Sequence, residues 1–296
     1  MTSLLTAVSR YADIHADADG VAATPIRSLS MVRATKPSDL LFAVYRPLVA
    51  LVVQGAKQVT FGTHSFPFAA GESMVVSADI PTVSQITKAS VAAPYYSLVL
   101  ELDPMLIAEL SGHMESVADT APASVRVEET DEEVADAALR LVRLLDRPAT
   151  IPLLQAQLVR ELHYWLLAGR HGRAIRHLGW PDGHAQRVGR AIAILRTDYA
   201  QSLPVERLAA AAGMSPSSFH HHFREITSLS PLQFQKHLRL IEARRLMLSE
   251  GRSPGHAAFD VGYESVSQFT REFGRMFGTP PARDVRSARE KVRLAG

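Results

Sequence analysis

The chain has no cysteine among its 296 residues. This absence excludes disulfide scaffolds, thiolate zinc sites, iron–sulfur clusters and thiol nucleophiles in one step. The sequence also lacks the roughly 18 consecutive apolar residues of a membrane-spanning helix, and its N-terminus lacks the basic and apolar regions of a signal peptide. We therefore expect a cytoplasmic protein with no membrane partner, whose chemistry uses groups other than thiols.

The composition, 47% hydrophobic and 21% charged, is ordinary for a packed protein, and the length suggests about two domains. Charge is divided unevenly between the two ends of the chain. Residues 181–296 carry 17 Lys and Arg against 11 Asp and Glu, whereas residues 1–180 carry 15 against 19. A basic C-terminal part suits a surface that meets a polyanion, although a solvated, salt-bridged helical surface has the same composition.

Between Leu48 and Leu102 the sequence has a β-like texture. Short runs rich in Val, Thr, Ile and Tyr are separated by Gly and Pro, namely LVALVVQG, KQVTFG, SMVVSA, SQITKAS and YYSLVLEL. Closely spaced strands with no helix between them predict a small antiparallel β-barrel or sandwich with a pocket at its mouth. The polar residues in or beside these strands that could contact a small-molecule effector are Gln54, Ser77, Asp79 and Tyr95.

A helical segment follows, in which four large apolar residues fall on one stripe. These are Leu154, Leu158, Leu162 and Trp165. The stripe faces either the β-domain or a second copy of the chain, and the sequence does not decide between them. The next stretch, residues 170–183, contains four Gly or Pro residues and is expected to be a linker.

Two stretches near the C-terminus share one plan at an offset of fifty residues, Leu203–Pro231 and Ser253–Pro281. Each has a short Ala-rich helix, a glycine, a serine before a longer helix, and an exit into proline. Gly213 and Gly262 stand where the chain turns sharply, a place that favours a residue tolerating positive φ. The pattern predicts two helix-turn-helix units on one long connecting helix, able to enter successive major grooves about 34 Å apart.

The longer helices are expected to bury phenylalanines and to present polar groups. Phe219 and Phe223 recur as Phe269 and Phe273, each pair on one helical face. The opposite faces carry Ser217, Ser218, His220, His221 and Arg224 in the first helix and Ser267, Gln268, Thr270 and Arg271 in the second. One helix-turn-helix pattern is typical of an ordinary helical hairpin, but its duplication on a basic segment favours DNA binding.

These motifs resemble those of a known family. The stretch from His184 to Arg286 is similar to the DNA-binding domain of AraC/XylS-type bacterial transcription regulators, above all in AAGMSPSSFHHHFREITSLSPLQFQKHLRLIEARRLM and VGYESVSQFTREFGRMFGTPPARDVR. The stretches TPIRSLSMVR, YRPLVALVVQGAKQVTFG and AGESMVVSADIPTVSQI resemble the cupin-like sensing half of one AraC subgroup.

The resemblance implies an α+β protein, with a small antiparallel cupin-like β-barrel and an all-α domain of two helix-turn-helix units. The expected domains are an effector-binding barrel at 20–115, a helical bridge and linker with a dimerisation role at 128–183, and the DNA-binding domain at 184–287. The expected function is transcription regulation without enzymatic activity. The expected partners are double-stranded promoter DNA, a small organic effector, RNA polymerase and a second copy of the chain.

By the same resemblance, the base-contacting positions are Ser217, His220 and His221 in the first recognition helix and Ser267, Gln268 and Arg271 in the second. Relatives commonly read Phe-His-Arg-His-Phe where this chain has three histidines, His220–His222. An imidazole lacks the fork that arginine offers to guanine, so the base preferred at His221 stays open. No motif names the effector, the target genes or the sign of regulation.

Two other functions fit parts of the sequence. A metal-dependent cupin-type enzyme needs a His and carboxylate cluster on adjacent strands, whereas the β-region offers His64, Glu72 and Asp79. Consecutive helical residues point about 100° apart, so His220–His222 are not expected to converge on one metal ion. A constitutive architectural DNA binder without an effector is the third reading. We expect no catalytic residue, no metal ligand and no cofactor.

Overall fold

The computed structural model describes residues 3–62, 64–114, 124–180 and 183–295. The chain divides into two units, Met1–Gln186 and Arg187–Gly296, which we call the sheet unit and the helical unit. The predicted domain boundary at residue 115 and the expected linker residues 181 and 182 lie outside the described residues. Within the described part of the chain, no helix has the length and apolar character needed to cross a membrane.

The sheet unit contains two antiparallel sheets. Their strand orders are β1-β2-β9-β4-β7-β10 and β3-β8-β5-β6. The strands are β1 (Val21–Ala23), β2 (Leu29–Ala34), β3 (Leu41–Tyr45), β4 (Leu48–Gln54), β5 (Ala56–Phe61), β6 (His64–Ala69), β7 (Glu72–Val76), β8 (Ile80–Lys88), β9 (Tyr95–Glu101) and β10 (Val125–Glu129). The predicted antiparallel architecture is confirmed, and the strands form two sheets that do not close into one barrel.

Five strands lie outside the runs that the sequence predicted, and four of these five are sheet edges. β1 and β10 border the six-stranded sheet, and β3 and β6 border the four-stranded sheet. β6 contains Pro67, which cannot donate to a ladder and is therefore tolerated at an edge. Edge strands are short and only partly buried, so their periodicity is weaker than that of central strands.

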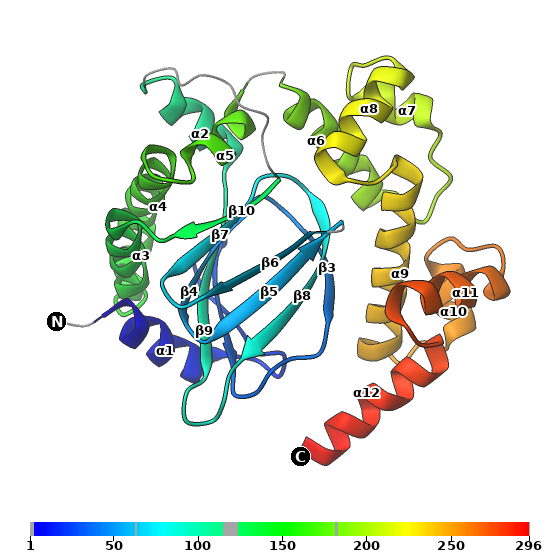
Figure 1. Ribbon diagram of the computed structural model, residues 1–296, viewed down its shortest axis with the longest axis horizontal. Helices are drawn as coiled ribbons and strands as arrows, with labels where there is room; N and C mark the ends of the chain where they lie inside the picture. The colour runs from blue at the N-terminus through cyan, green and yellow to red at the C-terminus, as the bar shows by residue number, and fades with distance from the viewer. Residues whose placement is uncertain (1–2, 63, 115–123, 181–182, 296) are drawn as a thin grey trace. The chain divides into compact units, whose positions relative to one another are not determined.

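Helices cover one face of the six-stranded sheet, namely α1 (Leu4–His15), α3 (Glu132–Leu144) and α4 (Ile151–Ala168) (Figure 1). The shared core contains Val49, Leu51, Leu98 and Leu100 from the strands and Val8, Leu141, Leu162 and Leu166 from the helices. The remaining elements of this unit are α2 (Pro104–Ser111), η1 (Pro148–Thr150), α5 (Gly172–Ile175) and η2 (Arg176–Gly179). The strand faces turned away from these helices meet the four-stranded sheet.

The prediction that residues 170–183 form a linker is wrong for most of this segment, because it is folded. α5 and η2 occupy Gly172–Gly179, and Ile175 and Leu178 belong to the core of the sheet unit. Glycine here permits close packing rather than flexibility, since a Cβ on Gly179 would collide with the backbone of Ala108 in α2.

The sequence left open whether the apolar stripe of α4 faces the β-domain or a second copy of the chain, and the two ends of the stripe differ. Leu162 is fully buried and Trp165 packs against the core of the sheet unit. Towards the N-terminus of the helix, Leu154 is 47% exposed and its neighbour Leu153 is 71% exposed. One end of α4 therefore faces the sheets, whereas the other leaves apolar surface uncovered in the single chain.

The helical unit consists of α6 (His184–Thr197), α7 (Val205–Ala211), α8 (Pro216–Thr227), α9 (Pro231–Ser249), α10 (Pro254–Asp260), α11 (Val266–Phe277) and α12 (Pro281–Ala295). α9 has 19 residues and is about 28 Å long. Phe234 near its start packs edge-on against Phe223 of α8, whereas Ala243 and Met247 further along join the core that contains Phe269 and Phe273 of α11. The two predicted helix-turn-helix units are thus carried by one connecting helix.

Candidate nucleic-acid interface

The two longer helices, α8 and α11, begin and end by the same local chemistry. Ser215 Oγ accepts a hydrogen bond from Ser218 N, and Ser265 Oγ accepts one from Gln268 N, both at 3.3 Å. Each serine caps its helix and leaves the first turn open to solvent. Both helices end at a left-handed residue, Ser228 (φ 57°) and Gly278 (φ 77°). The offset of fifty residues in the sequence therefore reproduces one backbone geometry twice.

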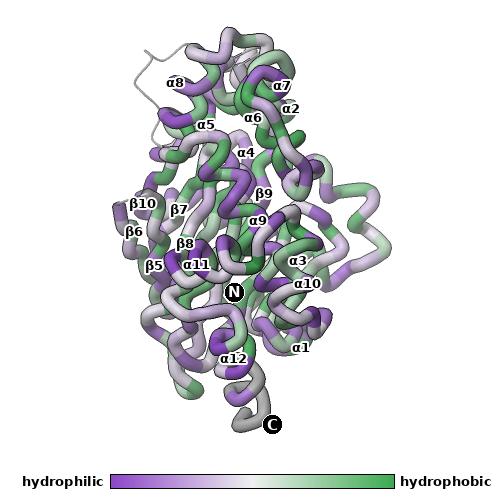
Figure 2. The backbone as a smooth tube through the Cα atoms, turned by 90° about the vertical axis from the view of Figure 1, so that its right-hand side faces the viewer, coloured by the Kyte–Doolittle hydropathy of each residue, from purple (hydrophilic) through white to green (hydrophobic). Residues whose placement is uncertain are grey.

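The buried and exposed faces follow the sequence prediction closely. Phe219, Phe223, Phe269 and Phe273 have no solvent exposure. The predicted contact residues that are exposed are Ser217, His220, His221, Arg224, Ser267 and Arg271, whereas Ser218, Gln268 and Thr270 are half-buried. Figure 2 shows hydrophilic, purple stretches on α8 and α11, as well as on α12.

Unpaired positive charge gathers on these same helices. Many cations of the helical unit are neutralised in ion pairs, for example Arg244 by Asp284 at 2.8 Å. Among the described side chains of α8, α11 and α12, five arginines form no ion pair. They are Arg224 on α8, Arg271 and Arg275 on α11, and Arg283 and Arg286 on α12. Cations that lack an internal partner remain available for phosphate oxygens.

Gln268 is held in place by Glu272 one turn later on α11. Its Nε2 donates to Glu272 Oε1 at 3.2 Å, and the same carboxylate accepts from Lys236 Nζ (2.8 Å) and Tyr263 OH (2.9 Å). Burial opposes ionisation of Glu272, but these hydrogen bonds outweigh it and lower its pKa. Sequence analysis missed Glu272, although its i, i+4 spacing from Gln268 was a usable signal.

Arg239 of α9 braces the turn of the second helix-turn-helix unit. Its guanidinium donates to the carbonyl oxygens of Tyr199 (2.7 Å), Gly262 (2.9 Å) and Gln201 (3.0 Å). Gln235 Nε2, one turn earlier, also donates to the Tyr199 and Gln201 carbonyls. The connecting helix thereby fixes both the end of α6 and the turn before α11. No local pattern marked Arg239, because its partners lie 23 to 40 residues away.

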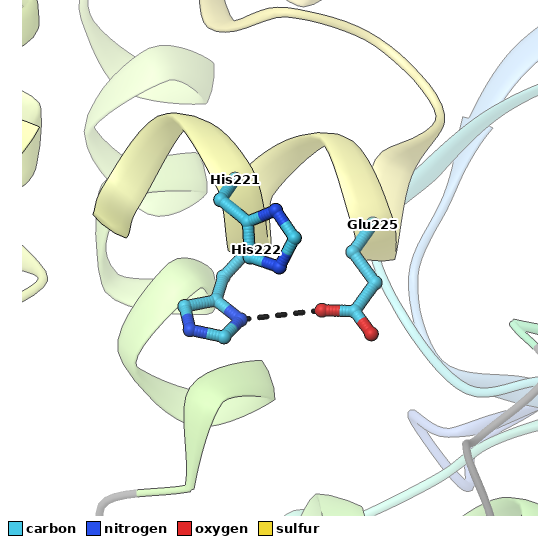
Figure 3. A group of neighbouring side chains, drawn as sticks. All are labelled: His221, His222 and Glu225. Atoms are coloured by element: carbon cyan, nitrogen blue, oxygen red, sulfur yellow. Dashed lines mark hydrogen bonds and ion pairs between the residues drawn. The ribbon is translucent and has the colours of Figure 1, made fainter. Parts of the chain in front are cut away.

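The histidines of α8 differ in part from the expectation. The rings of His221 and His222 lie 5.0 Å apart and edge to face, and His222 Nδ1 lies 3.2 Å from Glu225 Oε2 (Figure 3). Potential ligand atoms of His221, His222 and Glu225 all lie within 4.8 Å of one another. Successive helical residues point about 100° apart, and this does separate His220 from the group. It does not separate His221 from His222, because their side chains bend toward each other.

The four residues predicted to line an effector pocket do not form one cluster. Gln54 and Tyr95 lie at one end of the six-stranded sheet, where Gln54 Nε2 donates to Pro94 O at 2.8 Å. Ser77 and Asp79 follow β7, beyond the Leu48–Val76 pair at the other end. Six strand residues, or about 20 Å, separate Leu48 from Gln54.

One hollow in the sheet unit lies instead on its helical side. It has a volume of about 510 Å³ and contains none of the four predicted residues. Its polar lining is dominated by the arginines Arg10, Arg140, Arg143 and Arg147. Arg10 pairs with Asp146, and Arg140 pairs with Glu161.

Comparisons with known proteins agree with this architecture. A family model described as the N-terminus of AraC-type transcriptional regulators matches residues 25–174, which is half of the chain. A helix-turn-helix domain model matches residues 208–287 and includes α8 and α11. The two models together account for both units.

Curated relatives include the HTH-type transcriptional activator RhaS of several bacteria. The Escherichia fergusonii protein is 31% identical over 104 residues, which cover 35% of this chain and 37% of that protein. The Salmonella schwarzengrund protein is 25% identical over 197 residues, which cover 67% of this chain and 66% of that protein. The first matches thus span little more than a third of the relatives' length.

Solved structures with the same fold include ToxT from Vibrio cholerae. The wild-type protein bound to an unsaturated fatty acid superposes with a TM-score of 0.58 at 10% identity, covering 87% of this chain and 94% of that chain. A second ToxT structure, from strain O395, gives a TM-score of 0.56 at 9% identity and covers 88% and 97%. At these identities the likeness concerns the fold.

Proposed function

Because this chain belongs to the AraC-type transcriptional regulators, we propose that it regulates transcription by placing α8 and α11 in successive major grooves of promoter DNA. The observation that carries this proposal is the coincidence of two features on the same two helices. Both present an exposed polar face, and both carry arginines without an internal partner. Polar side chains of this size reach base edges, and free guanidinium groups bind phosphates or guanine.

We assign the contacts to the exposed residues Ser217, His220, His221, Arg224, Ser267 and Arg271, together with Gln268. Glu272 takes one hydrogen from the Gln268 amide. The carbonyl oxygen and the second N–H hydrogen of Gln268 have no partner among the described residues, and these are the acceptor and donor that an adenine edge requires. The pairing with Glu272 therefore restricts the Gln268 rotamer without using up its capacity for base recognition.

Arg271→Ala tests this assignment. If Arg271 reads a base, the variant should bind a selected DNA site more weakly by about 1–3 kcal/mol and lose its preference at one position. The measurement is a mobility-shift titration on DNA fragments selected by the purified protein. Arg245→Ala is the matched control, because its guanidinium is already held by Glu242 and Glu250 and should contribute little. Equal losses for both variants would refute a specific role for Arg271.

The sheet unit, residues 20–115 with the helical segment 128–183, is proposed to sense a small organic effector and to form a homodimer. The exposed Leu153 and Leu154 of α4 supply the apolar surface that a second copy would cover. Effector binding would change the fraction of molecules able to bind DNA, and through it the recruitment of RNA polymerase, as an activator. We place the protein in the cytoplasm, where its DNA is.

The alternative, a metal-dependent enzyme of cupin type, has weaker support. Among the described residues, the group of three neighbouring metal-ligating side chains lies on α8 and not in the sheets. His64, Glu72 and Asp79 stand on β6, on β7 and before β8, and they form no such group. We therefore propose a regulator without catalytic activity.

A further inference from the structure

A polar cluster lies between the two sheets and includes only Tyr95 of the four residues that the sequence suggested for an effector pocket. Lys57 of β5 donates to the Tyr45 hydroxyl at 3.3 Å, and its Nζ lies 5.9 Å from the Tyr45 ring centroid. The Tyr45 hydroxyl in turn donates to Ser84 Oγ at 3.2 Å. Tyr95 of β9, on the other sheet, interacts electrostatically with Lys57. Four strands, β3, β5, β8 and β9, and both sheets therefore contribute to one group of side chains.

Lys57 is a half-buried cation whose described partners are uncharged at neutral pH. Among the described residues it meets the hydroxyls of Tyr45 and Tyr95 and no carboxylate. Burial opposes the charged form, but attraction to these two tyrosines outweighs it and raises the pKa of Lys57. The ammonium group of Lys57 is therefore held by neutral hydroxyls, and no described carboxylate balances its charge.

Tyr95 adds a second unmet requirement. Its side chain has no solvent exposure, and its hydroxyl makes no hydrogen bond of normal geometry with any described residue. Burial raises the pKa of Tyr95, so the group is a neutral hydroxyl that can donate. Buried polar atoms are paired in the large majority of cases, so an orphaned hydroxyl indicates a missing acceptor. Ser97, two residues along the same face of β9, is also buried and acts on the Tyr95 hydroxyl as a donor that favours its ionised form, so it does not supply the acceptor.

We propose that Lys57 and Tyr95 bind the anionic head of the effector, and that the effector is a small organic carboxylate. The proposal rests on the sensing function assigned to the sheet unit. A carboxylate supplies both the counter-charge that Lys57 lacks and the acceptor that Tyr95 lacks. The direct cross-strand neighbours of Lys57 are the apolar residues Phe68 and Ile86, which suit an organic body. A single ammonium balances a monoanion better than a phosphate of nearly two charges.

The test uses the full-length chain and matched pairs of probes. Benzoate and octanoate are compared with benzamide and octanamide, and inorganic phosphate is included, by thermal unfolding and by calorimetry. At least one carboxylate should raise Tm and bind about tenfold more tightly than its amide, since only the anion pairs with Lys57. Lys57→Met should weaken that binding by about tenfold, and Tyr95→Phe by a smaller factor. Tyr95→Phe should not lower the Tm of the free protein, because the Tyr95 hydroxyl has no hydrogen-bond partner of normal geometry among the described residues.

Two control variants locate the binding. Lys88→Met removes an exposed lysine from β8 and should leave the affinity unchanged. Arg147→Met changes the arginine-lined hollow, and loss of binding there would overturn the assignment. The proposal also fails if phosphate is preferred, if no carboxylate shifts Tm, or if amides bind as well and Lys57→Met has no effect. If amides bind as well as carboxylates and Lys57→Met has no effect, the proposed sensing function still stands. The sensing function itself fails if no compound of any charge alters stability or DNA binding.

Discussion

At the scale of single residues, the sheet unit buries histidines whose uncharged form is favoured. His171 is 1% exposed and its Nε2 lies 2.8 Å from Ser73 Oγ on β7, so it joins α5 to the sheet. Burial lowers the pKa of His171 to about 4, although Glu128 and Asp131 attract the charged form. His163 of α4 is also buried, and burial lowers its pKa as well.

These histidines predict acid sensitivity of the sheet unit. The unfolded chain takes up a proton at His171 near pH 6.5, whereas the folded chain does so only near pH 4. The contribution of His171 to the free energy of unfolding is therefore fully present above pH 6.5 and is lost as the pH falls toward 4. The loss from this residue is no more than about 3 kcal/mol.

His171→Gln should flatten that slope, since an amide can still hydrogen-bond Ser73 but does not titrate. Urea unfolding of the sheet unit between pH 7 and 4 measures the effect, and His15→Gln on the exposed end of α1 is the control. An unchanged acid slope in His171→Gln would show that other groups cause the loss.

At the scale of elements, the two helix-turn-helix units place their glycines in different surroundings. Gly213 has φ +61° and a Cβ there would meet nothing closer than Arg187 Nη2 at 3.5 Å. Gly262 has φ +87° and a Cβ there would collide with the carbonyl of Ala200. The second turn thus needs glycine for space as well as for backbone conformation.

Gly213→Ala should cost about 1–2 kcal/mol, the price of a left-handed alanine. Gly262→Ala should cost clearly more, because the Ala200 backbone must also move and it is fixed by Arg239. Thermal unfolding of the two variants provides the comparison. Equal losses of stability would contradict the close approach of Ala200 to the second turn.

The helix-turn-helix elements were predictable from the sequence because their signals are local, whereas the polar cluster of Lys57, Tyr45 and Tyr95 between the sheets was not. The serine caps, the turn glycines and the paired phenylalanines of each recognition helix lie within about 15 residues of one another, as helix periodicity and capping require. Lys57, Tyr45 and Tyr95 meet only through strand pairing and sheet packing. Of the four residues chosen for an effector pocket, Tyr95 alone belongs to that cluster, because polar composition does not reveal which strand face is interior.

At the scale of the whole molecule, the division of charge in the sequence corresponds to the two units of the structure. In the helical unit, α8, α11 and α12 carry five described arginines without an ion pair. The sheet unit has an unsatisfied lysine and tyrosine in its interior. The sequence predicted the division into two domains and the basic character of the C-terminal one. The braces made by Arg239 and Glu272 were not predictable, since they depend on how α9 packs.

The central claim is that α8 and α11 read two separate segments of one DNA duplex. The most direct measurement is parallel selection of bound DNA fragments by the unmodified protein, His221→Ala and Arg271→Ala. The account predicts two blocks of preferred bases about 10–10.5 base pairs apart, with His221→Ala relaxing one block and Arg271→Ala the other. A single block, or loss of preference at the same positions in both variants, would contradict it.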